Sequence, residues 1–456
     1  MNITVCVRQG LDGELNPFDA CAYEAALQIE GGEVTLLSMG PATVKDFLHG
    51  LTRLGAKRAV LLCDPAFAGA DTLATAYTLS LAIRRLSPDL VFCGRQTLVG
   101  DTAQTGVMLA ELAGLDLITN VMQINAPDMD RITCTTRDEG EMTAKLPALL
   151  TVERINTLRL PRLRSRLGEI EVLDAAALGA DISRCGLTGS PTRVVKTFEN
   201  QSGKRKCKWI TRAELDAAIA EGLQRSRDRV EEESASGALL PLVCTVGEAP
   251  YAFARTVGAR IEVLPLSDAD DLVERIQRLS PNAVLWGSDA RSKRLAATVA
   301  ARLSLGLCAD CTRLESDGET LWMYRPALSG SIIAKIRSIT SPAMATVRTD
   351  SGAGEIVVGA GYGVREEMDR VRVFAREHGA ELAATRKMTD NGVTPYEYQV
   401  GLTGKTVSPP VYVAIGISGA VHHVVGMQRA GTVIAINPDR DAPIFEYADF
   451  GIAEEF

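Results

Sequence analysis

The chain has 456 residues, of which 46% are hydrophobic, and a net charge of −8 at pH 7, so it is long enough for about three domains with buried cores. The negative charge argues against nucleic-acid binding, because the basic runs at 159–166 and 204–206 are short enough to be solvated faces. Gly, Ser or charged residues interrupt each apolar stretch before it reaches the roughly 18 residues of a membrane span.

The N-terminal sequence Met-Asn-Ile-Thr-Val-Cys-Val-Arg predicts a first β-strand rather than a signal peptide, and we expect a cytoplasmic protein. The ten cysteines are scattered, and only Cys308 and Cys311 have the Cys-x-x-Cys spacing. Because the chain has only four histidines and no second cysteine pair near this one, we predict no metal site.

An internal duplication is visible in the sequence. Residues 83–94, Ile-Arg-Arg-Leu-Ser-Pro-Asp-Leu-Val-Phe-Cys-Gly, recur at 276–287 as Ile-Gln-Arg-Leu-Ser-Pro-Asn-Ala-Val-Leu-Trp-Gly. Each copy predicts the end of a helix, a proline stop, a buried strand and a glycine turn, and a helical pattern follows at 107–112 and at 295–303. Two related α/β domains are therefore expected, one from Met1 and one from about Leu240.

The loops that follow the two duplicated strands differ. The first, at 97–106, can turn at Gly100 and cap a helix with Asp101 or Thr102, which leaves backbone N–H groups for a phosphate. The second, at 288–293, has no glycine. We predict a nucleotide in the first copy and a scaffold role for the second, although 100–102 is also compatible with a plain helix start.

Residues 160–235 differ from a compact domain. The segment has a basic beginning, a Gly-Ser-Pro turn at 189–191 and a charged helical stretch from Arg212 to about Glu233. These features predict an extended arm, with residues 231–237 as a flexible linker.

Three turns of small residues lie close together in the last hundred residues. They are Gln-Val-Gly-Leu-Thr-Gly-Lys at 399–405, Gly-Ile-Ser-Gly-Ala-Val-His-His at 416–423 and Ala-Ile-Asn at 435–437. Apolar runs rich in β-branched residues, such as 411–415, adjoin them, so the turns are expected at strand ends, where an α/β sheet binds ligands. Glycine allows backbone N–H groups to approach phosphate oxygens, and the three turns together predict a nucleotide site.

These blocks resemble the C-terminal flavin domain of the electron-transfer flavoprotein α subunit, whose pattern is Gln-Val-Gly-Gln-Thr-Gly-Lys, Gly-Ile-Ser-Gly-Ala-Ile-Gln-His, Ala-Ile-Asn and Ala-Asp-Tyr-Gly. The first 200 residues resemble the β subunit of the same protein, so the chain resembles a natural β-then-α fusion. Cys-Gly-Arg-Gln at 93–96, Gly-Asp-Thr-Ala-Gln at 100–104 and Gly-Ser-Pro-Thr at 189–192 match the bifurcating branch most closely.

The resemblance implies an α/β fold with two related nucleotide-binding-type α/β domains and a C-terminal doubly wound parallel-sheet FAD domain. The expected bounds are 1–160 for the β-subunit-like domain, 161–239 for the arm and linker, 240–350 for the α-subunit-like scaffold domain and 351–456 for the FAD domain.

Two nucleotide sites follow from the resemblance. The C-terminal FAD site is expected to include Tyr362, Thr385, Arg386, Gln399, Val400, Gly401, Leu402, Thr403, Gly404, Ser418, Gly419, Ala420, Val421, His422, His423, Asn437 and Asp449. The N-terminal site is expected to include Val7, Asn16, Met39, Gly100, Asp101, Thr102, Ala103, Gln104, Thr105 and Gly106. This second site is expected to hold another FAD. AMP is the alternative, since the loop ends in Thr-Gly as in the non-bifurcating branch, which binds AMP there.

The resemblance also suggests roles for individual side chains. Arg386 would lie over the flavin ring and favour its singly reduced, negatively charged form. Thr403 would donate to the ring edge and His423 to a carbonyl oxygen of the pyrimidine ring. Tyr362 stands where the α pattern Ser-Gly-Gly-Arg-Gly has its arginine, so one positive charge near the flavin is expected to be lost.

Further groups are assigned to the rest of the cofactor. Ser418, Gly419 and Asn437 would hold the pyrophosphate and ribityl chain, and Asp449 a hydroxyl or the adenine end. No nucleophile and base pair is recognisable, so no catalytic residue is predicted, and the chemistry would belong to the cofactor.

The function implied is that of a single-chain electron-transfer flavoprotein, in the two-FAD form a bifurcating oxidoreductase. It would take a hydride from NADH and pass one electron to an acyl-CoA-type or other flavin dehydrogenase and one to ferredoxin or flavodoxin. The alternatives are a one-FAD carrier that contains AMP and a nucleotide-binding regulatory protein without electron transfer.

Overall fold

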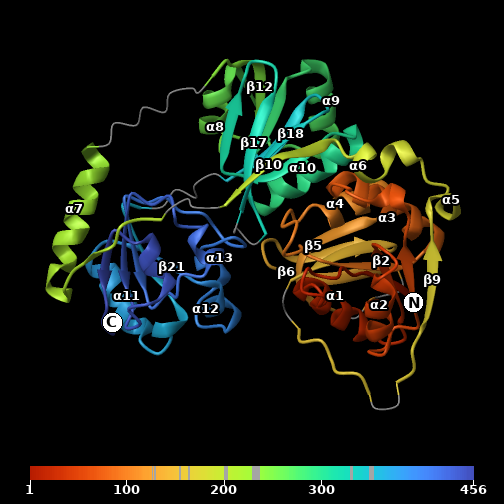
Figure 1. The fold of residues 1–456 in the computed structure, drawn as a ribbon, viewed down its shortest axis with the longest axis horizontal. Helices are drawn as coiled ribbons and strands as arrows, with labels where there is room; N and C mark the ends of the chain where they lie inside the picture. Colours follow the sequence, from red (N-terminus) through yellow and green to blue (C-terminus); the bar gives the residue numbers. More distant parts are fainter. Residues whose placement is uncertain are drawn as a thin grey trace. The chain divides into compact units, whose positions relative to one another are not determined.

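The computed structural model describes residues 1–125, 127, 130–153, 156–162, 165–199, 204–228, 237–328, 332–348 and 354–456 (Figure 1). The chain divides into two compact units. The first comprises residues 1–197, 235–328 and 334–347, and the second comprises 198–234, 329–333 and 348–456. Residues 231–236 of the expected linker and the expected domain boundary at 350 and 351 lie outside the described residues.

The first unit begins with a nine-stranded sheet in the order β7-β6-β5-β8-β4-β1-β2-β3-β9. The strands are β1 (Asn2–Cys6), β2 (Glu33–Met39), β3 (Arg58–Leu62), β4 (Leu90–Gly94), β5 (Asp116–Ile124), β6 (Arg131–Thr136), β7 (Gly140–Lys145), β8 (Ala148–Val152) and β9 (Glu169–Leu173). All neighbours are parallel except in the β5-β6-β7 meander. The alternation of apolar strands and helices produces this α/β arrangement, as the sequence predicted.

Helices cover both faces of this sheet. Buried residues of α1 (Pro17–Leu27) and α2 (Val44–Thr52) belong to one hydrophobic cluster, and those of α3 (Thr72–Leu86) and α4 (Thr105–Ala113) belong to another. Each helix buries one apolar stripe against the sheet, which is the reason for its periodic sequence.

A second sheet in the same unit repeats this design. Its order is β13-β12-β14-β19-β15, all parallel. The elements are β12 (Leu240–Val246), α8 (Tyr251–Val257), β13 (Gly258–Leu264), α9 (Ala269–Leu279), β14 (Ala283–Trp286), α10 (Ala290–Leu303), β15 (Leu307–Cys311) and β19 (Ala343–Val347). A four-stranded sheet of order β10-β18-β17-β16 adjoins them, formed by β10 (Thr192–Glu199), β16 (Arg313–Ser316), β17 (Leu321–Ala327) and β18 (Ile332–Ser338).

The predicted duplication is confirmed by equivalent hydrogen bonds. The backbone N–H of Asn2 donates to Asp89 Oδ2 at 2.7 Å, and that of Leu242 donates to Asn282 Oδ1 at 3.0 Å. The helices before these acceptors, α3 and α9, both end at a serine with a φ of 45°. The Ser-Pro-Asp/Asn repeat therefore encodes the same helix end and strand start twice.

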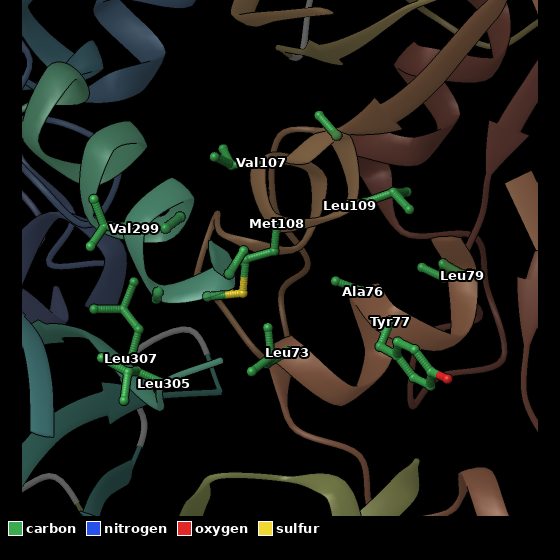
Figure 2. Packing of buried hydrophobic residues seen from close by; sticks show 14 of the residues in the cluster. Leu73, Ala76, Tyr77, Leu79, Val107, Met108, Leu109, Val299, Leu305 and Leu307 are labelled. Carbon is green, nitrogen blue, oxygen red and sulfur yellow. The ribbon is translucent and has the colours of Figure 1, made fainter. Parts of the chain in front are cut away.

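One core joins the two related domains. The buried residues of α3 and α4 form a continuous cluster with those of α10 and β15, including Leu73, Met108, Val299 and Leu307. Figure 2 shows these side chains converging from the two domains. Burial of a side chain of this size contributes about 1.5–3 kcal/mol, so the cluster makes the two domains one unit.

The second unit contains a six-stranded parallel sheet in the order β11-β24-β23-β22-β20-β21. Its strands are β11 (Lys208–Trp209), β20 (Ile356–Ala360), β21 (Glu381–Ala384), β22 (Val411–Ile415), β23 (Thr432–Ile436) and β24 (Phe450–Ile452). Two helices, α7 (Leu215–Asp228) and α11 (Met368–Glu377), pack on one face. The other face is covered by α13 (Val421–Val424), η6 (Pro443–Tyr447) and the loop that contains Val400 and Val407.

The segment expected to be an extended arm is divided between the two units. Residues 165–197 belong to the first unit, with β9, α5 (Ala175–Leu178) and α6 (Gly186–Gly189). Residues 204–228 are an integral part of the second, where β11 extends the sheet and α7 packs closely on it. A Cβ on Gly222 of α7 would lie only 2.8 Å from Val411 Cγ2. The charged residues of α7 belong to its exposed side, so its composition did not indicate that the other side packs on the sheet.

Among the residues that the structure describes, none of the helices has the length and apolar composition needed to cross a membrane.

Candidate functional sites

The predicted C-terminal site lies where the parallel strands of the second unit end. Gly361 and Tyr362 follow β20, Thr385 and Arg386 follow β21, Gly416 follows β22 and Asn437 follows β23. In this sheet, β21 lies on one side of β20 and β22 lies on the other, so the order in which strands are added reverses at β20. Such a switch point opens a crevice at the carboxyl ends of the strands, and this is where α/β sheets bind nucleotides.

Glycines bring the first turns at this crevice into backbone contact. A Cβ on Gly361 would lie 2.0 Å from Gly416 O, which no side chain tolerates. Gly416 has a φ of +62° and its N–H donates to Ile436 O at 2.9 Å. The N–H of Gly361 is also engaged, since it donates to Ile415 O at 2.7 Å, so these two glycines allow the turns to pack by backbone contact alone.

The loop at 399–405 is braced by buried side chains. Gln399 is 2% exposed, and its Nε2 donates to Thr403 Oγ1 at 2.7 Å. The hydroxyl of Thr389 donates to Gln399 Oε1 at 3.3 Å. Because Thr403 accepts from the amide, its own proton points away from Gln399. Arg348, which sequence reasoning did not identify, donates from Nη2 to Leu402 O at 3.1 Å.

Three further predicted residues show how the crevice is held. Leu402 N–H donates to His422 O at 2.6 Å, which joins the 399–405 loop to α13. Asn437 Nδ2 donates to Ile417 O at 2.9 Å, so this side chain ties two strand ends together. Arg386 pairs through Nε with Asp390 Oδ2 at 3.0 Å. The predicted residues Val400, Gly401, Gly404, Ser418, Gly419, Ala420, Val421 and His422 lie in these same loops or in α13.

The structure differs from the donor role predicted for His423. The ring is 5% exposed, with Nδ1 3.1 Å from Val400 O and Nε2 3.0 Å from the Tyr412 hydroxyl. Burial lowers the pKa of His423 from 6.5 to about 4, so the ring is neutral near pH 7. A carbonyl oxygen only accepts, so Nδ1 carries the proton and Nε2 accepts from Tyr412. His423 therefore braces the loop, and both of its nitrogens are engaged within the protein.

The assignment of Asp449 to the cofactor is corrected by the structure. Its Oδ2 accepts from Val433 N at 2.8 Å, near the start of β23, and it also pairs with Arg205. Asp449 precedes β24, so it lies at the amino ends of the strands, opposite the crevice.

His423 leads to a prediction for pH dependence. Because its pKa is lower in the folded chain than when unfolded, the unfolded chain binds more protons between pH 4 and pH 6.5. The stability that depends on neutral His423 is therefore present above this window and is lost as the pH falls through it, by on the order of 3 kcal/mol in total. In urea unfolding, we expect the difference between the parent and His423→Gln to shrink from about pH 7 to about pH 5. An equal difference at both pH values would show that His423 is not buried in its neutral form.

The predicted N-terminal site coincides with a cavity of about 1000 Å³ in the first unit. Val7 and Met39, at the ends of β1 and β2, line it together with Gly100, Thr102, Ala103, Gln104, Thr105 and Gly106. Asn16 and Asp101 stand beside it and brace Gln96, whose carbonyl accepts from Asn16 Nδ2 at 2.9 Å and whose Nε2 donates to Asp101 Oδ1 at 2.8 Å. Tertiary folding therefore assembles the whole predicted set.

The capping role predicted for Asp101 or Thr102 is wrong. The helix α4 begins at Thr105 with Gln104 in the N-cap position, and no side chain caps it. Asp101 has a φ of +53° and Ala103 of +55°, so the chain makes two left-handed steps before the helix begins. In the second copy Asp289 does cap, since its Oδ1 accepts from Ser292 N at 2.9 Å.

The most informative residue missed by sequence reasoning is Arg325 of β17. It belongs to the second domain but lines the N-terminal cavity, and its Nη2 donates to Asp101 O at 2.9 Å. The side chain is 6% exposed, and its Nε has no hydrogen-bond partner among the described residues. Gln104 Oε1, also buried at the cavity, likewise has none within the described part. Buried polar atoms of this kind are normally hydrogen-bonded, so the cavity is built for a polar ligand.

Two more features define the cavity. Asp71 and Thr72 at the start of α3 line it, with Asp71 capping that helix through the N–H groups of Leu73 and Ala74. Asp19 also lines it, and burial raises the pKa of this carboxyl to about 7. In the second copy, Trp286 takes the place of Cys93 and is fully buried. The scaffold role of the second domain stays a prediction.

Comparison with known proteins agrees with this geometry. The description "Electron transfer flavoprotein domain" matches residues 3–178 and 258–366, which is more than half of the chain. The chain belongs to the electron transfer flavoprotein family. The description "Electron transfer flavoprotein FAD-binding domain" matches residues 352–428, which contain most of the C-terminal crevice.

Relatives of this electron transfer flavoprotein cover its N-terminal half. Protein FixA of Azorhizobium caulinodans is 40% identical over 252 residues, 50% of this chain and 89% of the relative. The electron transfer flavoprotein subunit beta of Thermoanaerobacterium thermosaccharolyticum is 39% identical over 202 residues, which are 42% of this chain and 78% of the relative. The subunit beta of Megasphaera elsdenii is 40% identical over 211 residues, which are 42% of this chain and 78% of the relative. A β-like N-terminal half and an α-like FAD-binding domain thus occur in one chain.

The C-terminal residues fit FAD. Thr385 Oγ1 is buried at the end of β21 and has no hydrogen-bond partner in the described parts of the chain, so a ligand can supply one. The glycine turns at 361 and 416 bring the backbone of two strand ends together at the switch point, where a pyrophosphate binds in such folds. When bound, FAD supplies the redox chemistry, and the protein positions it and sets its electrostatic surroundings.

Proposed function

We propose that this electron transfer flavoprotein binds two FAD molecules, one in the C-terminal crevice and one in the N-terminal cavity, and that it bifurcates electrons. The observation that carries the proposal is the N-terminal cavity of about 1000 Å³ with the buried guanidinium of Arg325 on its wall. Drug-sized ligands occupy pockets of roughly 300–1000 Å³, so this one has the volume for a dinucleotide. AMP is only the adenylate part of FAD.

The charge of the cavity wall supports the same proposal. An arginine that is always positive is well suited to a cofactor that gains negative charge on reduction. In an electron-bifurcating protein the chain would take a hydride from NADH at the N-terminal site. One electron would pass by way of the C-terminal FAD to an acyl-CoA-type or other flavin dehydrogenase, and the other to ferredoxin or flavodoxin. We place this activity in the cytoplasm.

One observation favours a second candidate, a one-FAD carrier with AMP in the N-terminal cavity. The loop there ends in Thr105-Gly106, as in the family branch that binds AMP. The two candidates share the C-terminal FAD and differ only in what fills the cavity.

Cofactor content separates these candidates. Acid release from the purified chain followed by chromatographic quantification is expected to give two FAD per chain and no AMP. One FAD with one AMP would refute the bifurcating proposal and leave the family membership intact. Release of neither would favour a nucleotide-binding regulatory protein.

A functional measurement complements the count. Anaerobic addition of NADH to the two-FAD protein is expected to bleach the flavin absorbance of both sites. Absence of bleaching in a protein that holds two FAD would contradict NADH as the donor.

A further inference from the structure

Tyr362 stands at the C-terminal crevice where the α-subunit pattern has an arginine. It opens the 3₁₀ turn η4 (Tyr362–Val364) directly after β20, and its ring is half-buried. Two cations lie over this ring. Lys387 Nζ is 4.2 Å from the ring centroid, and Arg365 Cζ is 4.9 Å from it. The loss of positive charge expected from the sequence is therefore offset by neighbours that Tyr362 itself attracts.

Lys387 differs from the other cations at this edge. Arg365 pairs with Glu366 at 2.8 Å, and Arg386 pairs with Asp390 at 3.0 Å. No carboxylate forms an ion pair with Lys387 within the residues that the structure describes. Lys387 lies on α12 (Arg386–Asp390), at the carboxyl end of β21, which neighbours β20. Its charge is thus both located at the crevice and not neutralised by an ion pair in the described structure.

We propose that Lys387, held over the ring of Tyr362, is the relocated cation of the C-terminal crevice and acts on the negative charge of bound FAD. Tyr362 serves as the platform, because the negative face of an aromatic ring attracts the ammonium and restricts the positions of a long, flexible side chain. The inference rests on FAD in the C-terminal domain and is independent of the N-terminal ligand. A chain with one FAD and one AMP would refute two-FAD bifurcation and would leave the proposal for Lys387 unaffected.

The negative charge of FAD has two sources. The pyrophosphate is charged in every redox state, and the isoalloxazine ring becomes charged on reduction. A cation near the pyrophosphate changes the affinity for FAD, whereas a cation near the ring changes the reduction potential. In either case a unit charge at a partly exposed site contributes an effect of about fivefold, and salt weakens it.

The test compares Lys387→Met, Lys387→Arg and a matched control, Arg372→Met. Arg372 lies on α11 of the same unit, is 47% exposed and pairs with Asp369, so its loss changes the net charge equally without removing a cation from the ring of Tyr362. FAD rebinding to flavin-depleted protein is followed by flavin fluorescence at low and high salt, and the first reduction potential is measured by stepwise titration of the C-terminal FAD.

We expect Lys387→Met to weaken FAD binding about fivefold at low salt and less at high salt, with Lys387→Arg close to the parent. A lowered potential with unchanged affinity would also support the proposal and would identify the ring as the charged group. It is overturned if neither quantity changes by more than about twofold, or if Arg372→Met has the same effect.

A double-mutant cycle tests the platform. In the Tyr362→Leu background, the additional effect of Lys387→Met is expected to fall below about twofold, because the ammonium is no longer held at the crevice. An undiminished effect would show that Lys387 acts without Tyr362 and would overturn this part of the proposal.

Discussion

Replacement of Gly361 by alanine is expected to weaken FAD binding in the C-terminal crevice strongly. The new Cβ would lie 2.0 Å from Gly416 O and 2.6 Å from Ile417 N, both backbone atoms that cannot rotate away. The turns after β20 and β22 would have to separate, and the backbone of the crevice would move with them. Forced separation of this kind costs roughly 1–3 kcal/mol of stability, and more where the backbone is rigid.

The FAD that the full chain retains in the C-terminal crevice is measured after gel filtration. The free energy of unfolding is measured by urea titration. We expect the affinity for C-terminal FAD to fall by more than about a hundredfold if the full 3 kcal/mol appears in binding. Gly50→Ala is the control, since a Cβ there meets nothing within 4 Å and the residue lies within α2. Alanine at that position is expected to raise stability by about 0.5–1 kcal/mol. Normal FAD content in Gly361→Ala would contradict the packing of the two turns.

Replacement of Arg325 by methionine is expected to empty the N-terminal cavity selectively. The variant keeps the apolar stem but removes the buried guanidinium and its 2.9 Å hydrogen bond to Asp101 O. A hydrogen bond to a charged group contributes about 1.5–3 kcal/mol, so the affinity of the cavity for its nucleotide should fall roughly tenfold to a hundredfold. The C-terminal FAD provides an internal control because it lies in the other unit.

Occupancy is measured by nucleotide content after dialysis, together with circular dichroism to confirm the fold. Arg313→Met is a matched control in the same small sheet, since Arg313 of β16 is 65% exposed and pairs with Glu315. Arg325→Lys is expected to be intermediate, because an ammonium keeps the charge but not the planar fork of donors. Equal loss of both nucleotides in Arg325→Met would show that Arg325 maintains the fold, and no loss would remove it from the site.

Local sequence patterns predicted the main features of the fold because they depend on residues a few positions apart. The repeat at 83–94 and 276–287 specified two helix ends and two buried strands, and both occur where expected. The turns at 399–405 and 416–423 flank β22, and the strand ends of a parallel sheet necessarily meet at one edge. The duplication, the α/β class and the position of the small-residue turns at strand ends were therefore determined by the sequence itself.

Only the tertiary structure decided which side chains take part. Arg325 and Asp101 are 224 positions apart, and Arg205 and Asp449 are 244 apart, so neither contact leaves a signal in the local sequence. His423 bonds to Tyr412 and Val400, which are 11 and 23 positions away, and only the packing of the second unit decides that both ring nitrogens are engaged. A short motif specifies a turn. The burial, the hydrogen-bond partners and the position of a charged side chain depend on elements that are distant in the sequence and meet in the fold.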